Sequence, residues 1–322
     1  MSKILIIGAG GQIGSELTFK LRHLHGNDAV VASDINTHNM ELVNSGPFEI
    51  VDAEDFDSVK KCVDKHHIDT IYLMAAMLSA TGEKQPMRAW NLNMNSLFHV
   101  LNLAKDGVIK KIFWPSSIAV FGKTTPKANT PQHASMEPAT VYGITKQTGE
   151  RWCEYYHHKY DVDVRSLRFP GIISWKTMPG GGTTDYAVEI YHRAILNKKY
   201  ECFLSEDTAL PMMFMEDAIE AMTQLMNAPS THIKIRSSYN LSAISFTPSE
   251  ISAEIKRHIP DFTVSYNPDF RQQIADSWPN SIDDSKARED WNWNHQFDLR
   301  AITEEMLSQL EKKYESSHLE TD

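Results

Sequence analysis

The sequence has few cysteines, no long hydrophobic run and no excess of basic residues. Its three cysteines, Cys62, Cys153 and Cys202, are far apart, which argues against a disulfide framework or a CxxC metal site. The paired histidines lack the spacing and the cysteine partners of a zinc site, so we expect them at the surface and expect no metal. An odd number of separated thiols is typical of a reducing compartment.

Apolar runs such as ILII are too short to cross a bilayer, and a first strand from about Lys3 leaves no room for a signal peptide. The 42 acidic residues outnumber 32 scattered basic ones, giving a net charge of −10. We therefore expect a cytoplasmic protein with neither nucleic acid nor a membrane as partner. A length of 322 residues with 41% hydrophobic residues fits one large or two modest domains.

Residues 3–24, KILIIGAGGQIGSELTFKLRHL, run from an apolar strand through a glycine turn into an amphipathic helix. Gly8, Gly11 and Gly14 give the turn a GxxGxxG spacing, in which a backbone without Cβ atoms and a helix N-terminus suit a pyrophosphate. The next strand ends in Asp34, twenty positions after Gly14, where a carboxylate binds ribose hydroxyls and repels a 2′-phosphate. This pattern predicts NAD rather than NADP; the alternative for Asp34 is a helix cap.

Two further strands follow, FEIVDAED ending near Asp52 and TIYLMAA ending near Ala76. Asp52 is placed to meet the adenine amino group, and the small Ala75 and Ala76 leave room for a cofactor at the strand ends. The alternation of strands and helices predicts an α/β fold with a doubly wound parallel sheet of the Rossmann type.

A strand in KKIFWPSSIAVFG ends at Ser116 and Ser117, and a helix in VYGITKQTGERWCEYY carries Tyr142 and Lys146 one turn apart. A neighbouring ammonium lowers the pKa of a phenol, which makes Tyr142 a candidate general base. Tyr155 and Lys159 have the same spacing but lie on nearly the opposite helix face. The two serines favour Tyr142.

Gly8, Gly11, Gly14, Asp34, Ser117 and the Tyr142-x-x-x-Lys146 motif resemble the extended short-chain dehydrogenase/reductase family over most of the chain. The resemblance implies that Ser117 holds the reacting oxygen, Tyr142 moves its proton, and Lys146 tunes Tyr142 and binds the nicotinamide ribose. The residues expected to bind the cofactor NAD are Gly8, Gly11, Gln12, Ile13, Gly14, Asp34, Ile35, Asp52, Ala53, Leu73, Ala75, Ala76, Asn93, Tyr142, Lys146 and Phe169.

Members of this family that act on nucleotide sugars typically carry an Asn and an Arg where this chain has Arg168-Phe169-Pro170-Gly171 and residues 211–217, PMMFMED. A diphosphate needs several donors or a bidentate cation, which a Pro-Met pair does not supply. A nucleotide-sugar epimerase or dehydratase, and a non-catalytic NAD-binding redox sensor, are the alternative functions.

The strings PSSIAVFG, VYGITKQTGE, GGGTTDYAVEIYH, LPMMFMEDA and PDFRQQIADSWPNSIDDS are similar to the short-chain type of L-threonine 3-dehydrogenases. That resemblance implies metal-free oxidation of L-threonine at Cβ to 2-amino-3-ketobutyrate. The glycine-rich stretch 179–187, PGGGTTDYA, then belongs to an amino-acid pocket rather than a phosphate cradle; the alternative is a surface turn that caps a helix beginning near Asp185. The residues expected to contact the substrate are Ser79, Ser116, Ser117, Tyr142, Gly182, Thr183, Thr184 and Trp278.

We expect residues 1–170, with 212–242 returning to them, to form the NAD-binding domain, and residues 171–322 to form mainly a smaller substrate lobe that closes over the substrate. A helix start at TPSE, residues 247–250, belongs to this lobe, and Trp291 and Trp293 are more often core than contact residues. By analogy with the family, helices beginning near Met94 and Tyr142 pair two copies into a homodimer.

Overall fold

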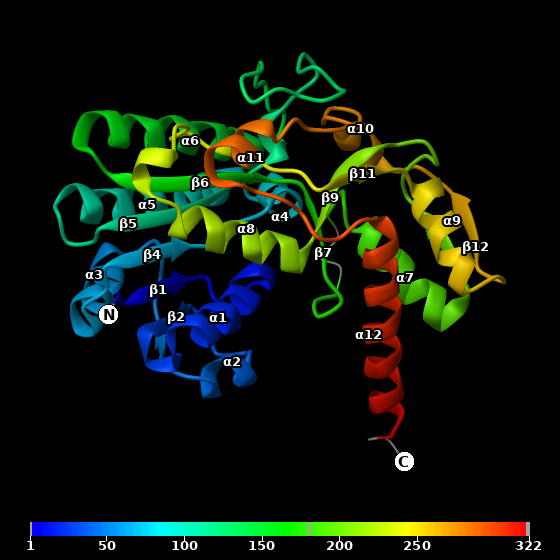
Figure 1. Cartoon of the computed structure of the whole chain (residues 1–322), viewed down its shortest axis with the longest axis horizontal. Helices are drawn as coiled ribbons and strands as arrows, with labels where there is room; N and C mark the ends of the chain where they lie inside the picture. The colour runs from blue at the N-terminus through cyan, green and yellow to red at the C-terminus, as the bar shows by residue number, and fades with distance from the viewer. Residues whose placement is uncertain (1, 179, 181, 320–322) are drawn as a thin grey trace.

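A computed structural model describes residues 2–178, 180 and 182–319 (Figure 1). Within these residues, strands in the order β10-β6-β5-β4-β1-β2-β3 form a parallel sheet. Its strands are β1 (Ile4–Ile7), β2 (Val30–Asp34), β3 (Phe48–Ile50), β4 (Thr70–Leu73), β5 (Lys111–Ser117), β6 (Asp163–Phe169) and β10 (Tyr239–Asn240). The order reverses beside β1, which confirms the predicted doubly wound sheet.

Helices cover both faces of this sheet, because its strands are apolar on both sides. Ile4 and Ile6 of β1 join one buried cluster, while Leu5 and Ile7 join the other. The first face carries α1 (Gln12–His25), α2 (Met40–Asn44), α8 (Met215–Asn227) and α11 (Ser285–Trp291). The second carries α3 (Phe56–His66), α5 (Pro86–Lys105) and α6 (Val141–Tyr160), with α4 (Ser79–Lys84) against α5 and α6. Short turns of 3-10 helix are η1 (Asn27–Ala29), η2 (Ile118–Val120) and η3 (Ser230–His232).

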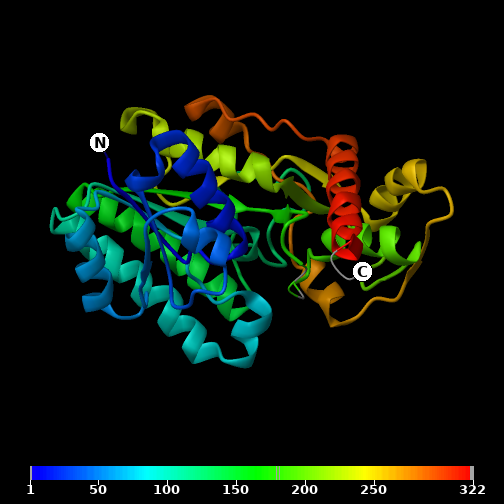
Figure 2. The same cartoon turned by 90° about the horizontal axis from the view of Figure 1, so that it is seen from below.

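A smaller lobe lies beside the carboxyl ends of the sheet strands (Figure 2). It has its own buried cluster, centred on residues such as Tyr186, Tyr191 and Phe214. Its strands are β7 (Gly171–Ile173), β9 (Leu210–Phe214) and β11 (Ile244–Phe246) in one sheet, and β8 (Lys199–Cys202) with β12 (Thr263–Tyr266) in another. Its helices are α7 (Tyr186–Asn197), α9 (Pro248–His258), α10 (Phe270–Ala275) and α12 (Leu299–Leu319).

The chain crosses between the two regions more often than the sequence suggested. Within the segment 212–242, α8 packs against β6 and β10 pairs with β6, whereas β9 belongs to a lobe sheet, so the return of the whole segment stays a prediction. Trp291 and Trp293 also lie in the core of the nucleotide-binding region, although we expected their segment in the lobe. Tyr239 of β10 fixes α11 there, because its hydroxyl donates to Asp290 at 2.7 Å. Aromatic content predicts burial but does not say in which core a side chain is buried.

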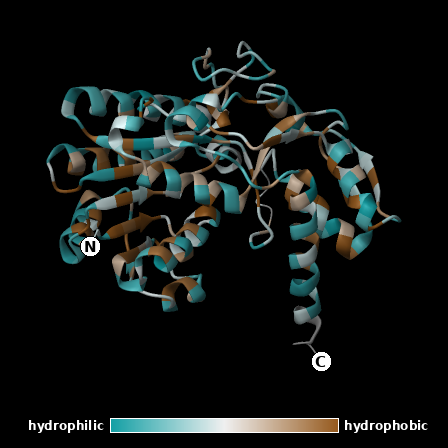
Figure 3. Cartoon of the chain, in the orientation of Figure 1, coloured by the Kyte–Doolittle hydropathy of each residue, from teal (hydrophilic) through white to brown (hydrophobic). Residues whose placement is uncertain are grey.

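All three cysteines are buried, and burial is the main reason that the pKa of each thiol is raised, to about 12 for Cys62 and about 11 for Cys202. Cys62 and Cys153 lie in the cluster under α3, α5 and α6, whereas Cys202 lies in the lobe. Hydropathy varies across the sheet: β1 and β2 are largely hydrophobic, whereas β6 carries hydrophilic residues (Figure 3). No helix in the described part of the chain is both long and apolar enough to span a membrane.

Candidate active site

The first glycine turn joins β1 to α1 at very short range. Gly8 has a φ of +88°, and a Cβ there would lie 2.5 Å from the backbone nitrogen of Ala75. A Cβ on Gly14 would lie 2.3 Å from the carbonyl oxygen of Gly8, so only glycine lets α1 approach this closely. The first turn of α1 has Gly11 as its N-cap, no side-chain cap and no acidic residue. This helix N-terminus therefore fits a pyrophosphate, whose charge its amides and dipole favour.

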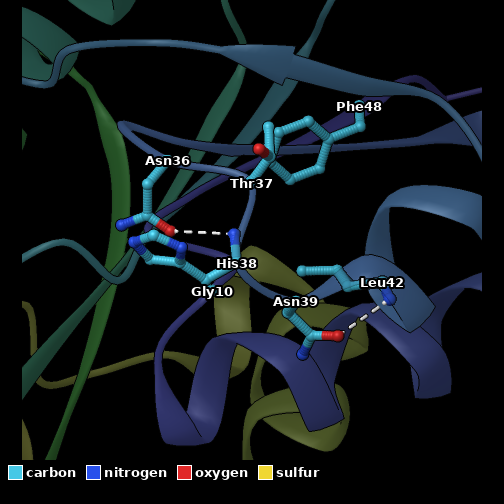
Figure 4. A pocket seen from close by; sticks show the side chains of 7 residues that line it. All are labelled: Gly10, Asn36, Thr37, His38, Asn39, Leu42 and Phe48. Carbon is cyan, nitrogen blue, oxygen red and sulfur yellow. Dashed lines mark hydrogen bonds between the residues drawn. The ribbon is translucent and has the colours of Figure 1, made fainter.

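Asp34, the last residue of β2, lies next to this turn. Its carboxylate accepts a hydrogen bond of 2.9 Å from the amide of Gly10, a residue that the GxxGxxG spacing does not single out. A pocket of about 360 Å³ opens beside it, lined by Gly10, Asn36, Thr37, His38, Asn39, Leu42 and Phe48 (Figure 4). A polar run directly after the strand that ends in the acidic residue was the available signal for this pocket. Its position fits the adenosine end of the cofactor.

The other residues expected at the cofactor gather at the same edge of the sheet. Gln12 and Ile13 open α1, and Ile35, which is 65% exposed, follows β2. Leu73 ends β4 and is followed by Ala75 and Ala76, while Phe169 ends β6. Asp52 and Ala53 follow β3, and the Asp52 carboxylate accepts a bond from the amide of Glu54 at 2.9 Å. The parallel strands end at the same edge of the sheet, which places these residues near one another. Their contact with the cofactor stays our prediction.

Asn93 has a structural task in addition to the cofactor contact that the resemblance implies. Its side-chain oxygen accepts from the amide of Met77 at 2.8 Å, and its nitrogen donates to the Met77 carbonyl at 3.1 Å. The same nitrogen donates to the Thr145 hydroxyl at 3.1 Å. Asn93 therefore fastens the loop after β4 to α6, beside Lys146.

Ser117 and Tyr142 meet where β5 ends and α6 begins. The Ser117 side chain accepts from the Ala119 amide at 3.2 Å and lies close enough to the Tyr142 phenol to oppose the rise that burial causes in the pKa of that group. Gly143 allows this approach, because a Cβ there would lie 2.2 Å from the Ala119 carbonyl oxygen. Thr140 starts the helix by accepting from the Gly143 amide at 3.1 Å. The structure thus brings together two of the three predicted catalytic side chains.

Lys146 lies one turn further along α6 and is buried. Its ammonium donates to the Pro115 carbonyl at 2.5 Å and lies 5.5 Å from the centre of the Tyr142 ring. Burial lowers the pKa of Lys146 to about 7, against the opposing charges of Cys153 and Glu150. Burial also raises the pKa of Tyr142 to about 12, and the Ser117 hydrogen bond opposes that rise. We expected Lys146 to lower the pKa of Tyr142; in this structure burial raises that pKa instead.

Ser116 faces away from Ser117 because neighbouring strand residues point to opposite sides. Its hydroxyl is buried and donates to Glu150 at 2.7 Å. Glu150 in turn accepts two bonds from the Arg168 guanidinium, at 2.9 and 2.7 Å. We therefore withdraw the predicted substrate contact of Ser116, which instead packs β5 and β6 against α6.

The second tyrosine and lysine pair lies outside the site. The Tyr155 side chain is 46% exposed and packs edge-on against Trp152, whose ring centre is 5.6 Å away. Lys159 is exposed as well. The helical spacing therefore decided correctly which of the two pairs can face Ser117.

The second glycine-rich turn is closed by a carboxylate. Asp185 accepts from the amides of Gly180 and Gly182, at 2.7 and 2.8 Å. Pro179 and Gly181, also part of the predicted pocket stretch, lie outside the described residues. A helix does begin there, at Tyr186, but the Asp185 side chain makes no cap bond to it. A carboxylate on these amides repels phosphate, which agrees with the prediction that this turn is not a phosphate cradle.

The remaining predicted substrate residues surround this turn. Thr183 is buried, and Thr184 packs against Gly171, whose added Cβ would lie 2.8 Å from the Thr184 methyl group. Trp278 belongs to the buried cluster against which Tyr142 packs. Ser79 is half-buried at the start of α4. Their contact with a substrate stays a prediction.

Lys127 is a residue that the sequence did not reveal. Its ammonium donates to the carbonyls of Asp276 and Trp278, at 2.7 and 3.0 Å, and so fixes the position of that tryptophan. A lone lysine in a loop gives no sequence signal for such a contact.

Comparison with known proteins agrees with this site. Residues 4–242 match the NAD dependent epimerase/dehydratase family. An uncharacterized epimerase/dehydratase of Staphylococcus haemolyticus is 48% identical over 315 residues, which are 97% of this chain and 99% of that protein. The solved structure of a GalE-like L-threonine dehydrogenase from Cupriavidus necator, in its holo form, is 52% identical, with a TM-score of 0.92 over 96% of this chain and 99% of that one.

A second solved structure, of a monomeric L-threonine 3-dehydrogenase from a metagenome, is 47% identical, with a TM-score of 0.91 over 96% of this chain and 99% of that one. The match with the family covers most of the chain and includes the glycine turn, Asp34, Ser117, Tyr142 and Lys146. The chain therefore belongs to the NAD dependent epimerase/dehydratase family, within the extended short-chain dehydrogenases/reductases, and is an enzyme that uses NAD in an oxidation.

Proposed function

We propose that this enzyme oxidises the Cβ hydroxyl of L-threonine to give 2-amino-3-ketobutyrate. The observation that carries the proposal is the position of Tyr142 beside Ser117, with the buried Lys146 ammonium 5.5 Å from its ring centre, together with a second glycine turn whose amides donate to a carboxylate. The L-threonine dehydrogenases among the similar structures support the choice of substrate.

Each catalytic side chain has one task in this proposal. Tyr142 takes the proton of the Cβ hydroxyl, and Ser117 donates a hydrogen bond to the oxygen that becomes the ketone. The Lys146 ammonium, 5.5 Å from the Tyr142 ring centre, favours the phenolate that Tyr142 needs as a base. When bound, NAD supplies the hydride acceptor. The open amides at the start of α1 and the carboxylate of Asp34 are the groups that would hold it.

The surroundings of the site suit a small amino acid better than a nucleotide sugar. Asp185 occupies the amides of the second glycine turn. Pro211, Met212 and Met213 of β9 are buried and apolar, so this strand offers no donor to a diphosphate. The Arg168 guanidinium forms an ion pair with Glu150 and also donates to the side-chain oxygen of Asn240 at 2.9 Å, so it is not available to a diphosphate. These contacts support an amino acid, rather than a nucleotide sugar, as the substrate.

The test is NADH formation by the purified protein with NAD and L-threonine. L-allo-threonine, L-serine and NADP serve as controls. We expect rapid NADH formation with L-threonine and NAD alone. Absence of turnover with every amino acid contradicts the proposal, and assays for epimerisation of nucleotide sugars then follow.

We also propose that two copies pair through α5 and α6. The outer side of these helices carries a row of aromatic side chains that includes Trp152, Tyr155 and Tyr160, which are 37%, 46% and 43% exposed. Phe98 of α5 joins the row edge-on, 5.0 Å from Trp152. Such a patch is typical of an interface. Sedimentation velocity at micromolar concentration should show a dimer, and a monomer there excludes it.

A further inference from the structure

A half-buried carboxylate on the cofactor helix α1 bonds to residues of the lobe. Glu16, in the second turn of α1, accepts from the Ser174 hydroxyl at 2.9 Å and from the Lys176 ammonium at 2.8 Å. The side chain of Glu16 is 9% exposed and Ser174 is 1% exposed, whereas the Lys176 side chain is 45% exposed, so the bond to Ser174 is the better shielded of the two. Charge-assisted bonds at such a site are stronger than those of exposed pairs.

Ser174 directly follows β7, and β7 supports the substrate turn at its other end. Gly171 begins β7 and lies against Thr184, with 2.8 Å between an added Cβ and the Thr184 methyl group. The strand is three residues long and pairs with β9 from Gly171 to Ile173, so it links Ser174 to Gly171 over a short, hydrogen-bonded path. The β7 strand therefore connects Ser174 at one end with Thr184 at the other.

Other charges confirm that Ser174–Lys176 is a junction between the two regions. The Lys313 ammonium of α12 donates to the carbonyls of Lys176 and Trp175, at 3.2 and 3.5 Å. Glu216 of α8 also faces Lys176 and Glu16, and Glu305 of α12 is near Glu216. Of these carboxylates, Glu16 is the one that lies on α1 and bonds to both Ser174 and Lys176.

We propose that Glu16 is a positioning residue that couples occupancy of the cofactor site to binding of the amino acid, acting through Ser174 and β7 on Thr184. This inference rests on the proposed function for the identity of the amino acid. A ligand that fixes α1 at its N-terminus fixes Glu16 one turn later, and so favours the arrangement of Thr184 that binds the substrate. Such coupling between two sites typically changes affinity by about 5-fold to 150-fold, equally in both directions.

The first experiment is calorimetric titration of L-threonine into the protein with and without saturating NADH, a pair that cannot react. We expect NADH to tighten L-threonine binding at least about 5-fold in the natural chain and less than about 2-fold in Glu16→Gln, with the affinity for NADH nearly unchanged. Lys20→Gln is the matched control, because Lys20 lies one turn further along α1 and pairs with the exposed Glu220 instead. Equal coupling in Glu16→Gln and the natural chain overturns the proposal.

A second measurement does not depend on the substrate. Hydrogen exchange of residues 171–178 should slow when NADH is added to the natural chain and to Lys20→Gln, and change little in Glu16→Gln and Ser174→Ala. If L-threonine does not bind at all, the substrate assignment fails, and this exchange pattern still decides the role of Glu16. Protection by NADH that is absent in the natural chain, or equal in all four proteins, overturns the proposal.

Discussion

The two glycine-rich turns of this chain have similar composition and opposite surroundings. In the turn at residues 8–14, the glycines let α1 approach β1, and the helix N-terminus carries no side-chain cap. In the turn with Gly180 and Gly182, both amides donate to Asp185. In the first turn only the Gly10 amide donates to a carboxylate, that of Asp34, and the N-terminus of α1 stays open to an anion, while the second turn already holds one. What distinguishes a phosphate cradle is therefore the partner of the amides, not the number of glycines.

If the first turn binds the cofactor and the second binds the amino acid, the Tyr142 hydroxyl should take part in the reaction and not in binding. We predict that Tyr142→Phe lowers kcat about 10²-fold to 10⁴-fold, because general-base catalysis is lost. The dissociation constants of NADH and L-threonine should each change less than about 2-fold by calorimetry. Tyr155→Phe, on the outer face of the same helix, is the control and should keep full activity. A Tyr142→Phe enzyme with normal kcat rules out the catalytic assignment.

Gly14→Ala tests the first turn alone. A Cβ at 2.3 Å from the Gly8 carbonyl must push α1 away, which we expect to cost about 1–3 kcal/mol and to weaken NADH binding roughly 10-fold to 100-fold. Fluorescence titration with NADH measures the change. Gly180→Ala is the control from the second turn, where an added Cβ lies 3.8 Å from Asp185 and NADH affinity should be unaffected. Equal effects of both substitutions contradict the division between the turns.

Asp185→Asn tests the second turn. The two amides keep an acceptor but lose its charge, and charge-assisted bonds are the stronger ones, so the KM for L-threonine should rise roughly 10-fold. The affinity for NADH should stay constant. Asp207→Asn, an exposed residue between β8 and β9, is the control. A rise in the NADH dissociation constant, with the KM for L-threonine unchanged, reverses the assignment of the turns.

The smallest expected effect concerns Lys146, which lies between the turns. Its folded pKa of about 7 is below its usual 10.5, so the unfolded chain binds more protons above pH 7 and stability rises with pH from about 7 to 10.5. Relative to Lys146→Met, urea unfolding of the natural chain should show a gain of about 1 kcal/mol from pH 7 to pH 8. Lys159→Met, at an exposed position, should show no such difference. A flat difference between pH 7 and 10 shows that burial does not lower the pKa of Lys146 in the folded chain.

Local patterns were sufficient to predict the frame of the site. Strand, glycine turn, helix and Asp34 are adjacent in the sequence, and helical spacing separated Tyr142 from Tyr155. Contacts between distant segments were not predictable in this way. Ser116 and Ser117 look alike in the sequence, yet strand alternation sends Ser116 to Glu150. Asp185 stands at the start of α7, where a helix was expected to begin, and its carboxylate accepts from Gly180 instead of capping the helix, a contact that depends on the three-dimensional path of the turn.

The same limit explains Trp291 and Lys127. The burial of Trp291 follows from its type, but its place against Tyr239 depends on the return of the chain to β6. The contact between Lys127 and the Trp278 carbonyl joins residues 151 positions apart. Such contacts depend on the order in which the chain returns to the sheet. A single sequence predicts that order only where its motifs resemble those of a known fold.

The three buried thiols allow local unfolding of this enzyme to be followed by chemical labelling. At neutral pH almost none of the Cys62, Cys153 or Cys202 side chains is a thiolate, so an alkylating reagent has no nucleophile to attack while the chain is folded. The rate at which Cys202 is modified then reports the local unfolding of the lobe. The rates for Cys62 and Cys153 report the unfolding of the core under α3, α5 and α6. Mass spectrometry of the labelled peptides would show whether the two regions unfold together or in succession.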